Sequence, residues 1–167
     1  NELAEYALSI LPDGDVRCVD YLNPLSRMNW HRGQYEQAEL YATHANTLSK
    51  YHNYNLGLAD SYNSLGNTAY YLGHYQASII YYRQCQELHH ELGNQWDWAF
   101  NLHNMGWVFP FVGDYESAWD YVEQGQSIFI ELDDIWGIAN GYYIMALIAS
   151  HQGNFVDALE FHLKSLD

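Results

Sequence analysis

Nine histidines and 21 acidic residues are the side chains that could support catalysis or metal binding in this 167-residue chain. The sequence has no His-Glu-x-x-His string and no cysteine pair with metal-binding spacing. His89, His90 and Glu91 are consecutive, so a helix would point them in different directions. Asp13-Gly14-Asp15 lacks the remaining ligands of a calcium loop. Since a phosphate-binding glycine loop and a nucleophile elbow are also missing, we expect no enzyme activity, no metal site and no cofactor.

Amides and aromatic rings are the better candidates for binding a partner. Asn63 and Asn67 are four residues apart, so a helix would present both amides on one face. An amide carries donors and an acceptor together, which suits the backbone of an extended peptide. The alternative is that the two amides bond to each other or to neighbouring helices. The chain also has 16 Tyr, 6 Trp and 6 Phe, and rings outside the core could stack on a ligand.

The charge of the chain limits the classes of partner. The formal net charge is −15, and the six lysines and arginines are scattered, which argues against direct binding to nucleic acid or to an anionic membrane. No apolar run is long enough to span a bilayer. Cys18 and Cys85 are far apart and are interpreted as small buried residues in a reducing compartment, so we expect a cytoplasmic protein.

The elements that carry these residues follow from an internal repeat. Four short strings begin with a glycine, have an aromatic ring two residues later and have Ala or Ser five residues later. Their glycines lie 40 residues apart, at Gly33, Gly73, Gly113 and Gly153. Seven residues before each glycine is a small residue, in the order Ser26, Gly66, Gly106 and Ala146. Eight residues after each glycine is a ring, in the order Tyr41, Tyr81, Tyr121 and Phe161.

These columns predict pairs of antiparallel helices. The small residue would let the paired helices approach closely, and the glycine would end the first helix with a positive φ. We expect first helices near 15–31, 55–71, 95–111 and 135–151, and second helices near 34–52, 74–92, 114–132 and 154–167. Turns are expected at Asn53, Gly93-Asn94 and Asp133-Asp134. The rings eight residues after the glycines are predicted to belong to the core.

Two prolines disturb the pattern. Pro110 should kink the last turn of the third first helix. Pro24 either lies within the opening first helix or breaks it, with Asn23 then capping a helix that starts at Pro24.

We predict one all-α domain over 1–167, a right-handed α-solenoid of antiparallel helix pairs. Its repeats would cover about 15–52, 55–92, 95–132 and 135–167, after a partial helix at 1–11. Residues 1–11 look like the tail of an earlier second helix, and the last repeat is about five residues short. We therefore expect the chain to be an excerpt of a longer protein.

The repeat resembles the tetratricopeptide repeat family over essentially the whole chain. The family's Leu-Gly pair appears as Leu65-Gly66 and Met105-Gly106, and its Gly-x-Tyr-x-x-Ala pattern appears four times, with Ser78 once in place of Ala. The 40-residue period is similar to the long variety found in kinesin light chains, polarity scaffolds and bacterial signalling proteins. Glu91-Leu92-Gly93-Asn94 resembles the bacterial version in particular.

In that family the first helices line a concave face that binds partners, and Asn67 matches the position of an Asn that holds the peptide main chain. The resemblance therefore implies a set of ligand-binding or peptide-binding residues on this face: Asn23, Arg27, Trp30, Asn63, Asn67, Tyr70, Tyr71, His103, Trp107, Asn140 and Tyr143. For the rings among them, the alternative is packing between helices.

The sequence favours a protein-binding or peptide-binding scaffold, as the sensor or interaction module of a larger bacterial signalling or transcription-regulatory protein. The alternative is a domain that senses a sugar or metabolite, as in LuxR-type regulators or cyclases, through the concave-face aromatics. A homodimer through the ends of the array is a further hypothesis. Most acidic residues fall on second helices, which disfavours a groove that attracts basic peptides by acidic charge alone.

Overall fold

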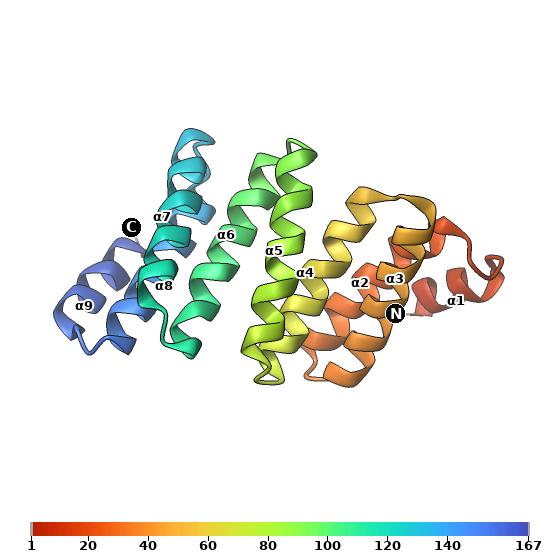
Figure 1. The fold of residues 1–167 in the computed structure, drawn as a ribbon, viewed down its shortest axis with the longest axis horizontal. Coiled ribbons are helices and arrows are strands. Elements are labelled where there is room, and N and C mark those ends of the chain that lie inside the picture. The colour runs from red at the N-terminus through yellow and green to blue at the C-terminus, as the bar shows by residue number, and fades with distance from the viewer. Residues whose placement is uncertain (1, 167) are drawn as a thin grey trace. The chain divides into compact units, whose positions relative to one another are not determined.

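The computed structural model describes residues 2–166, and the regular elements in this range are all helical (Figure 1). The helices are α1 Glu2–Ile10, η1 Val16–Cys18, α2 Val19–His31, α3 Tyr35–His52, α4 Asn55–Tyr71, α5 Tyr75–Glu91, α6 Gln95–Val108, η2 Phe109–Val112, α7 Tyr115–Glu131, α8 Ile135–His151 and α9 Phe155–Lys164. The chain divides into two compact units, of which the first ends at Leu92 and the second begins at Gly93. The fold is the predicted α-solenoid of helix pairs.

Left-handed residues end the helices at a regular spacing of 20. The four repeat glycines have φ between 73° and 80°, which confirms their predicted role. Asn53, Gly93 and Asp133 have φ values of 55°, 68° and 54°, as expected for the turns between pairs. Glycine tolerates this conformation because it has no Cβ atom that would clash. Asparagine and aspartate tolerate it because their short polar side chains form hydrogen bonds with the nearby backbone. The sequence therefore places the turns correctly.

Small residues let paired helices pack closely, as predicted. A Cβ atom added at Gly66 of α4 would lie 2.6 Å from the ring of Tyr82 on α5. The Ser78 hydroxyl donates to the carbonyl oxygen of Gly66 over 2.8 Å, and the Ser26 hydroxyl donates to that of Ala38 over the same distance. The α4–α5 pair thus combines a short approach with a buried hydrogen bond, and the α2–α3 pair has the equivalent bond.

The rings eight residues after each glycine lie at the edge of the core, which refines the core prediction: Tyr41 and Tyr81 pack against buried clusters but are themselves only half-buried. Tyr41, Tyr81, Tyr121 and Phe161 are all of intermediate exposure. The residues one position later in the first three repeats, Ala42, Tyr82 and Val122, are buried. One residue turns a helix by about 100°, so the face that points at the partner helix lies one position further along.

The two prolines have different effects. Of the two alternatives for Pro24, the continuous helix is correct: α2 runs through Pro24 and does not start there, and only the turn before Val19 is a 3₁₀ helix. At Pro110, α6 ends at Val108 and passes into the 3₁₀ helix η2. A proline inside an α-helix removes a hydrogen bond and crowds the preceding turn, and the change to η2 relieves this crowding.

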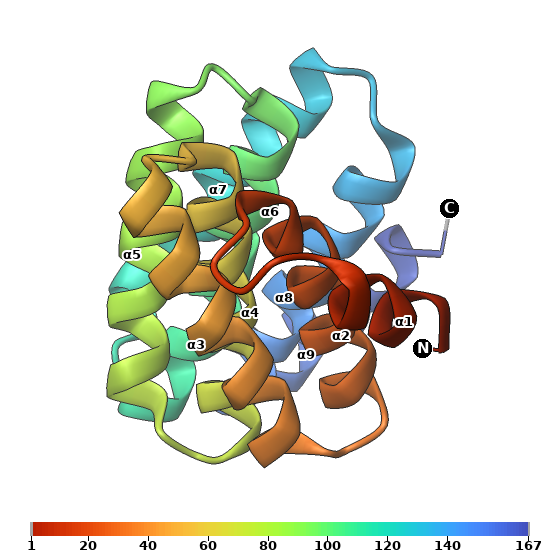
Figure 2. The same ribbon diagram turned by 90° about the vertical axis from the view of Figure 1, so that its right-hand side faces the viewer.

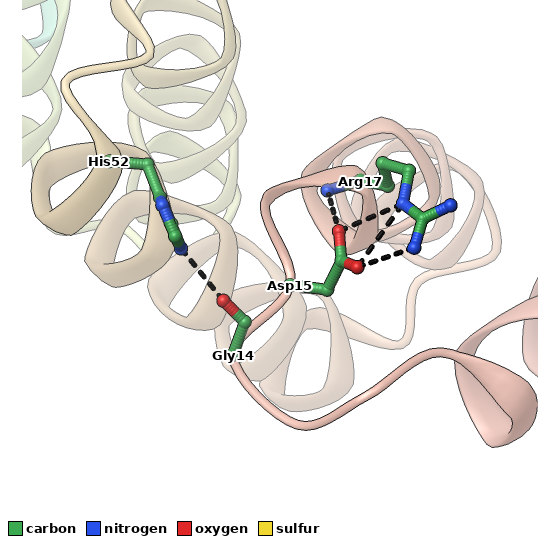
Figure 3. Close-up of polar contacts among 4 residues, drawn as sticks. All are labelled: Gly14, Asp15, Arg17 and His52. Carbon is green, nitrogen blue, oxygen red and sulfur yellow. Dashed lines mark hydrogen bonds and ion pairs between the residues drawn. The ribbon is translucent and has the colours of Figure 1, made fainter.

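The loop before α2 is held by polar contacts (Figure 3). The guanidinium of Arg17 makes a two-pronged ion pair with Asp15, with a shortest distance of 2.6 Å. These hydrogen bonds lower the pKa of Asp15 to about 2. The Nε2 atom of His52 lies 2.7 Å from the carbonyl oxygen of Gly14, which ties the loop to the end of α3. Helix α1 packs beside α2 (Figure 2).

Among the helices described, none combines the length and the apolar character that crossing a membrane requires.

Candidate ligand-binding face

In the first unit, the first helices α2 and α4 lie against each other. They carry seven of the predicted binding residues, and these differ in exposure. Arg27 and Tyr71 are exposed, whereas Trp30, Asn63, Asn67 and Tyr70 are partly buried. The seventh, Asn23, is buried and donates from Nδ2 to the carbonyl oxygen of Gly57 over 3.0 Å. Asn23 therefore joins α2 to α4 and is not presented to a partner, because its donor is used by the backbone carbonyl of Gly57.

Asn67 is held between two neighbours. Its Nδ2 atom donates to the carbonyl oxygen of Asn63 over 3.0 Å, and its Oδ1 atom accepts from the hydroxyl of Tyr82 over 3.0 Å. Tyr82 is buried, and this burial raises the pKa of its hydroxyl. The amide of Asn67 is thus oriented by its own helix and by α5. This arrangement corresponds to the alternative in which the amide bonds to a neighbouring helix instead of a partner.

The rings at the ends of α2 and α4 form one stack. The ring of Tyr71 lies between those of Trp30, at 5.3 Å, and Tyr35, at 5.5 Å, with interplanar angles of 24° and 7°. Tyr70 meets Tyr71 edge-on at 5.1 Å. Tyr71 keeps 48% of its surface exposed, so the stack is packed and accessible at the same time.

In the second unit, the first helices α6 and α8 also lie against each other. His103 of α6 is fully buried, and its Nδ1 atom lies 3.2 Å from Nδ2 of Asn140 on α8. Burial lowers the pKa of His103 to about 4. His103 is therefore part of the packing between helices and is not available to a partner, which corrects the prediction made for it.

Trp107 and Tyr143 do come together on the same pair of helices. Their ring centroids are 5.6 Å apart with an interplanar angle of 25°, a stacked arrangement. Trp107 is partly buried, and Tyr143 is 45% exposed. The ring of His162 on α9 lies 5.6 Å from that of Tyr143. This pair offers an accessible aromatic surface with its rings already ordered.

Within residues 2–166, no group of three or more His, Cys, Asp or Glu side chains is placed to hold a metal ion.

A comparison with protein families matches residues 59–88 to the tetratricopeptide repeat. Residues 59–88 therefore match a tetratricopeptide repeat, and the chain has the helix-pair fold of such repeats. The matched stretch covers most of α4 and α5, including Leu65-Gly66 and the string that begins at Gly73. It also contains Asn63, Asn67, Tyr70 and Tyr71. No curated protein matches the chain.

Solved structures share the fold of this chain. Aspartyl phosphate phosphatase F from Bacillus subtilis is 20% identical with a TM-score of 0.83, and the match covers 97% of this chain and 42% of that one. A Rap protein complexed with competence and sporulation factor is 18% identical with a TM-score of 0.84, covering 96% and 46%. A kinesin-light-chain-type protein with nearly identical TPR-like repeats from Podosopora anserina is 14% identical with a TM-score of 0.74, covering 98% and 80%. The chain therefore spans less than half the length of the first two.

A second ring cluster, on α6 and α8, was not among the predicted site residues. Trp96 of α6 stacks on Phe100 at 5.4 Å and on Trp136 of α8 at 6.0 Å. Trp96 and Trp136 are 39% and 57% exposed. The signal in the sequence is that the two tryptophans occupy the same repeat position, 40 residues apart.

Proposed function

We propose that this tetratricopeptide-repeat protein is a scaffold that binds a protein or a peptide through its first helices. The observation that carries the proposal is the stacked, accessible pair Trp107 and Tyr143 on α6 and α8. Two ordered rings lose little conformational entropy on binding and offer a large contact area, which is how aromatic residues dominate many interfaces. In the first unit, α2 and α4 carry a surface that mixes polar and aromatic side chains, namely Arg27, Asn63, Tyr70 and Tyr71.

The proposal is supported by the solved structures as well. One relative was solved in complex with competence and sporulation factor, and another has the repeats of a kinesin light chain. The similarity in sequence is low, so it supports the type of fold and leaves the partner to experiment.

We propose further that the chain is the interaction module of a larger bacterial signalling or regulatory protein. Its two cysteines are buried and are not joined in a disulfide, which fits the reducing cytoplasm.

The binding of a sugar or metabolite is the second candidate function. The same pair, Trp107 and Tyr143, favours it, because a flat aromatic surface also stacks on the apolar face of a sugar ring. The two candidates differ in what else they need. A peptide requires an extended surface along the helices, whereas a small molecule requires only the ring pair.

The test is selection from a library of random peptides displayed on phage, followed by fluorescence anisotropy with the selected peptides. Tyr143→Ala should weaken binding by about tenfold, which is about 1.4 kcal/mol. Truncation of a residue that contributes to an interface costs more than about 1 kcal/mol of binding free energy. The matched control is Tyr51→Ala, because Tyr51 is 81% exposed on the second helix α3. This control should bind like the parent protein.

Selection of no peptide, or equal loss with Tyr143→Ala and Tyr51→Ala, would contradict the peptide-binding proposal. A thermal-shift screen with sugars then tests the second candidate, with Tyr143→Ala again as the variant expected to lose the response.

A further inference from the structure

The rings of Trp96, Phe100 and Trp136 form an exposed surface at the start of α6 and α8. Trp96 lies nearly parallel to Phe100, at 11°, and to Trp136, at 22°. Phe100 and Trp136 are 5.8 Å apart. Trp136 has 57% of its surface exposed, and its neighbour Ile135 has 75%. Two large rings are thus ordered by packing while their outer surface faces solvent.

A carboxylate is built into this cluster. The indole N–H of Trp96 donates to Oδ2 of Asp134 over 2.6 Å, and Oδ1 of Asp134 accepts from the backbone N–H of Gly137 over 2.8 Å. The hydrogen bond from Gly137, and after it that from Trp96, holds the pKa of Asp134 below its ordinary value, so the group is charged at neutral pH. Donation to a carboxylate also increases the electron density of the indole ring.

The helix ends oppose this charge but do not cancel it. Each helix N-terminus carries the equivalent of about half a positive charge. Two such ends, of α6 and α8, are therefore worth about one charge. Asp97 follows Trp96 directly, and Asp133 and Asp134 precede α8, which gives three carboxylates at the same ends. The balance at the ring cluster is negative.

No basic side chain of the second unit competes for the rings. Lys164 is the only lysine or arginine in residues 93–167. It pairs with Glu160 over 2.7 Å and lies over the rings of Phe161 and Tyr142, at 5.5 and 5.9 Å. The rings of Trp96 and Trp136 therefore have no lysine or arginine of their own unit stacked on them.

We propose that Trp96 and Trp136 form a platform for a cationic side chain, arginine or lysine, of a bound peptide. The reasons are the exposed surface of the two indoles, whose π-electrons attract a cation, and the surplus of carboxylates around them. A guanidinium can stack flat on an indole while its N–H groups reach Asp134 or Asp133. This inference builds on the proposed peptide binding and names the chemistry of one part of the partner, at rings separate from Trp107 and Tyr143.

The probes are Nα-acetyl-arginine methylamide and its neutral isostere Nα-acetyl-citrulline methylamide, which need no prior peptide ligand. Binding is followed by the NMR shifts of the indole N–H groups, assigned by single tryptophan substitutions. The arginine probe should shift the signals of Trp96 and Trp136 saturably and leave that of Trp107 nearly unchanged. The citrulline probe should bind about fivefold more weakly, the size of a cation–π contribution at an exposed site.

Trp136→Leu keeps an apolar side chain and removes the ring, so it should weaken binding of the arginine probe about twofold to fivefold. Trp136→Phe should retain part of the binding, and circular dichroism checks that both variants are folded. Equal binding of the two probes, a common shift of all indole signals, or unchanged binding by Trp136→Leu would overturn the platform. None of these results would affect the phage selection, so failure of the platform and failure of the peptide-binding proposal remain distinguishable.

Discussion

The buried ring of His103 on α6 accepts a hydrogen bond at Nδ1 from the side-chain amide of Asn140 on α8, over 3.2 Å. The ring also lies between two glycines: an added Cβ atom would be 2.5 Å from it at Gly125 of α7 and 2.9 Å from it at Gly141 of α8. Three helices of the second unit therefore meet around one titratable side chain. Protonation of this ring would place a second N–H against the Asn140 donor and a charge in a buried site.

The stability of the second unit should consequently depend on pH through His103. The unfolded chain has an ordinary histidine pKa of 6.5, and burial lowers the folded value to about 4, so the unfolded state binds more protons between these values. The stabilising effect of a neutral His103 is complete above pH 6.5 and is lost as the pH falls toward 4. The full loss, reached below pH 4, amounts to about 3 kcal/mol, and about 2 kcal/mol of it falls between pH 7 and pH 5. Urea unfolding at pH 7 and near pH 5, followed by tryptophan fluorescence, measures it, since all tryptophans except Trp30 belong to this unit.

His103→Asn keeps an acceptor near Nδ1 and cannot be protonated, so this variant should lose most of that pH dependence. The exposed His44 on α3 provides the control, and His44→Asn should behave like the parent. An unchanged pH dependence in His103→Asn would show that other groups cause it.

Two fully buried serines of the first unit should respond in opposite directions to substitution by alanine. The Ser26 hydroxyl donates to the carbonyl oxygen of Ala38, whereas the Ser49 hydroxyl has no hydrogen-bond partner within residues 2–166. Ser26→Ala should lower the free energy of unfolding by about 1 kcal/mol, because it removes a buried bond. Ser49→Ala should leave it unchanged or raise it, because it removes an unsatisfied polar group. Urea unfolding followed by far-UV circular dichroism compares the two, and a loss with Ser49→Ala would indicate a missed partner.

Glycines at helix contacts should differ in their tolerance of a methyl group. A Cβ at Gly137 would lie 2.2 Å from the ring of Phe129, which is fully buried, so Gly137→Ala should destabilise by about 1–3 kcal/mol. The nearest atom at Gly106 is Cβ of Val122, 3.1 Å away, and the better helix propensity of alanine offsets that crowding by about 1 kcal/mol. Gly106→Ala should therefore stay within about 1 kcal/mol of the parent in thermal or urea unfolding. Equal losses of stability in Gly137→Ala and Gly106→Ala would contradict the closer helix contact at Gly137.

Tyr82 and Asn67 should be coupled through their hydrogen bond. Tyr82→Phe and Asn67→Ala should each reduce stability by about 1 kcal/mol, since each removes the same buried bond. The double variant should lose less than the sum, by about 0.5–1 kcal/mol. A double-mutant cycle measures this difference, and strict additivity would mean that the bond contributes nothing to stability.

Much of the fold was predictable from residue spacing because the turn residues act locally. Gly33 and Asp133 adopt positive φ through their own backbone and side chain, without help from distant groups. The 40-residue period repeats these local signals, and its agreement over many positions identified the helix pairs. Pro24 was harder to interpret, because a proline in the second turn of a helix is tolerated or rejected according to packing around it.

The candidate site was predictable only in part. The helical period placed Trp107 and Tyr143 on neighbouring first helices, and the structure stacks them. The same period could not distinguish an accessible residue from one covered by the next helix. Asn23 and His103 occupy equivalent repeat positions to the accessible Tyr143, yet both are buried.

The sequence by itself determined the helix pairs, their turns and the tetratricopeptide-repeat fold, since these depend on local backbone preferences and on the spacing of small and apolar residues. Only the tertiary structure decided which side chains remain accessible. Gly125 and Gly141 let helices close over His103, Gly57 offers its carbonyl to Asn23, and Asp134 orders the exposed ring of Trp96. Accessibility depends on how closely three helices approach, and that distance is set by side chains far apart in the chain.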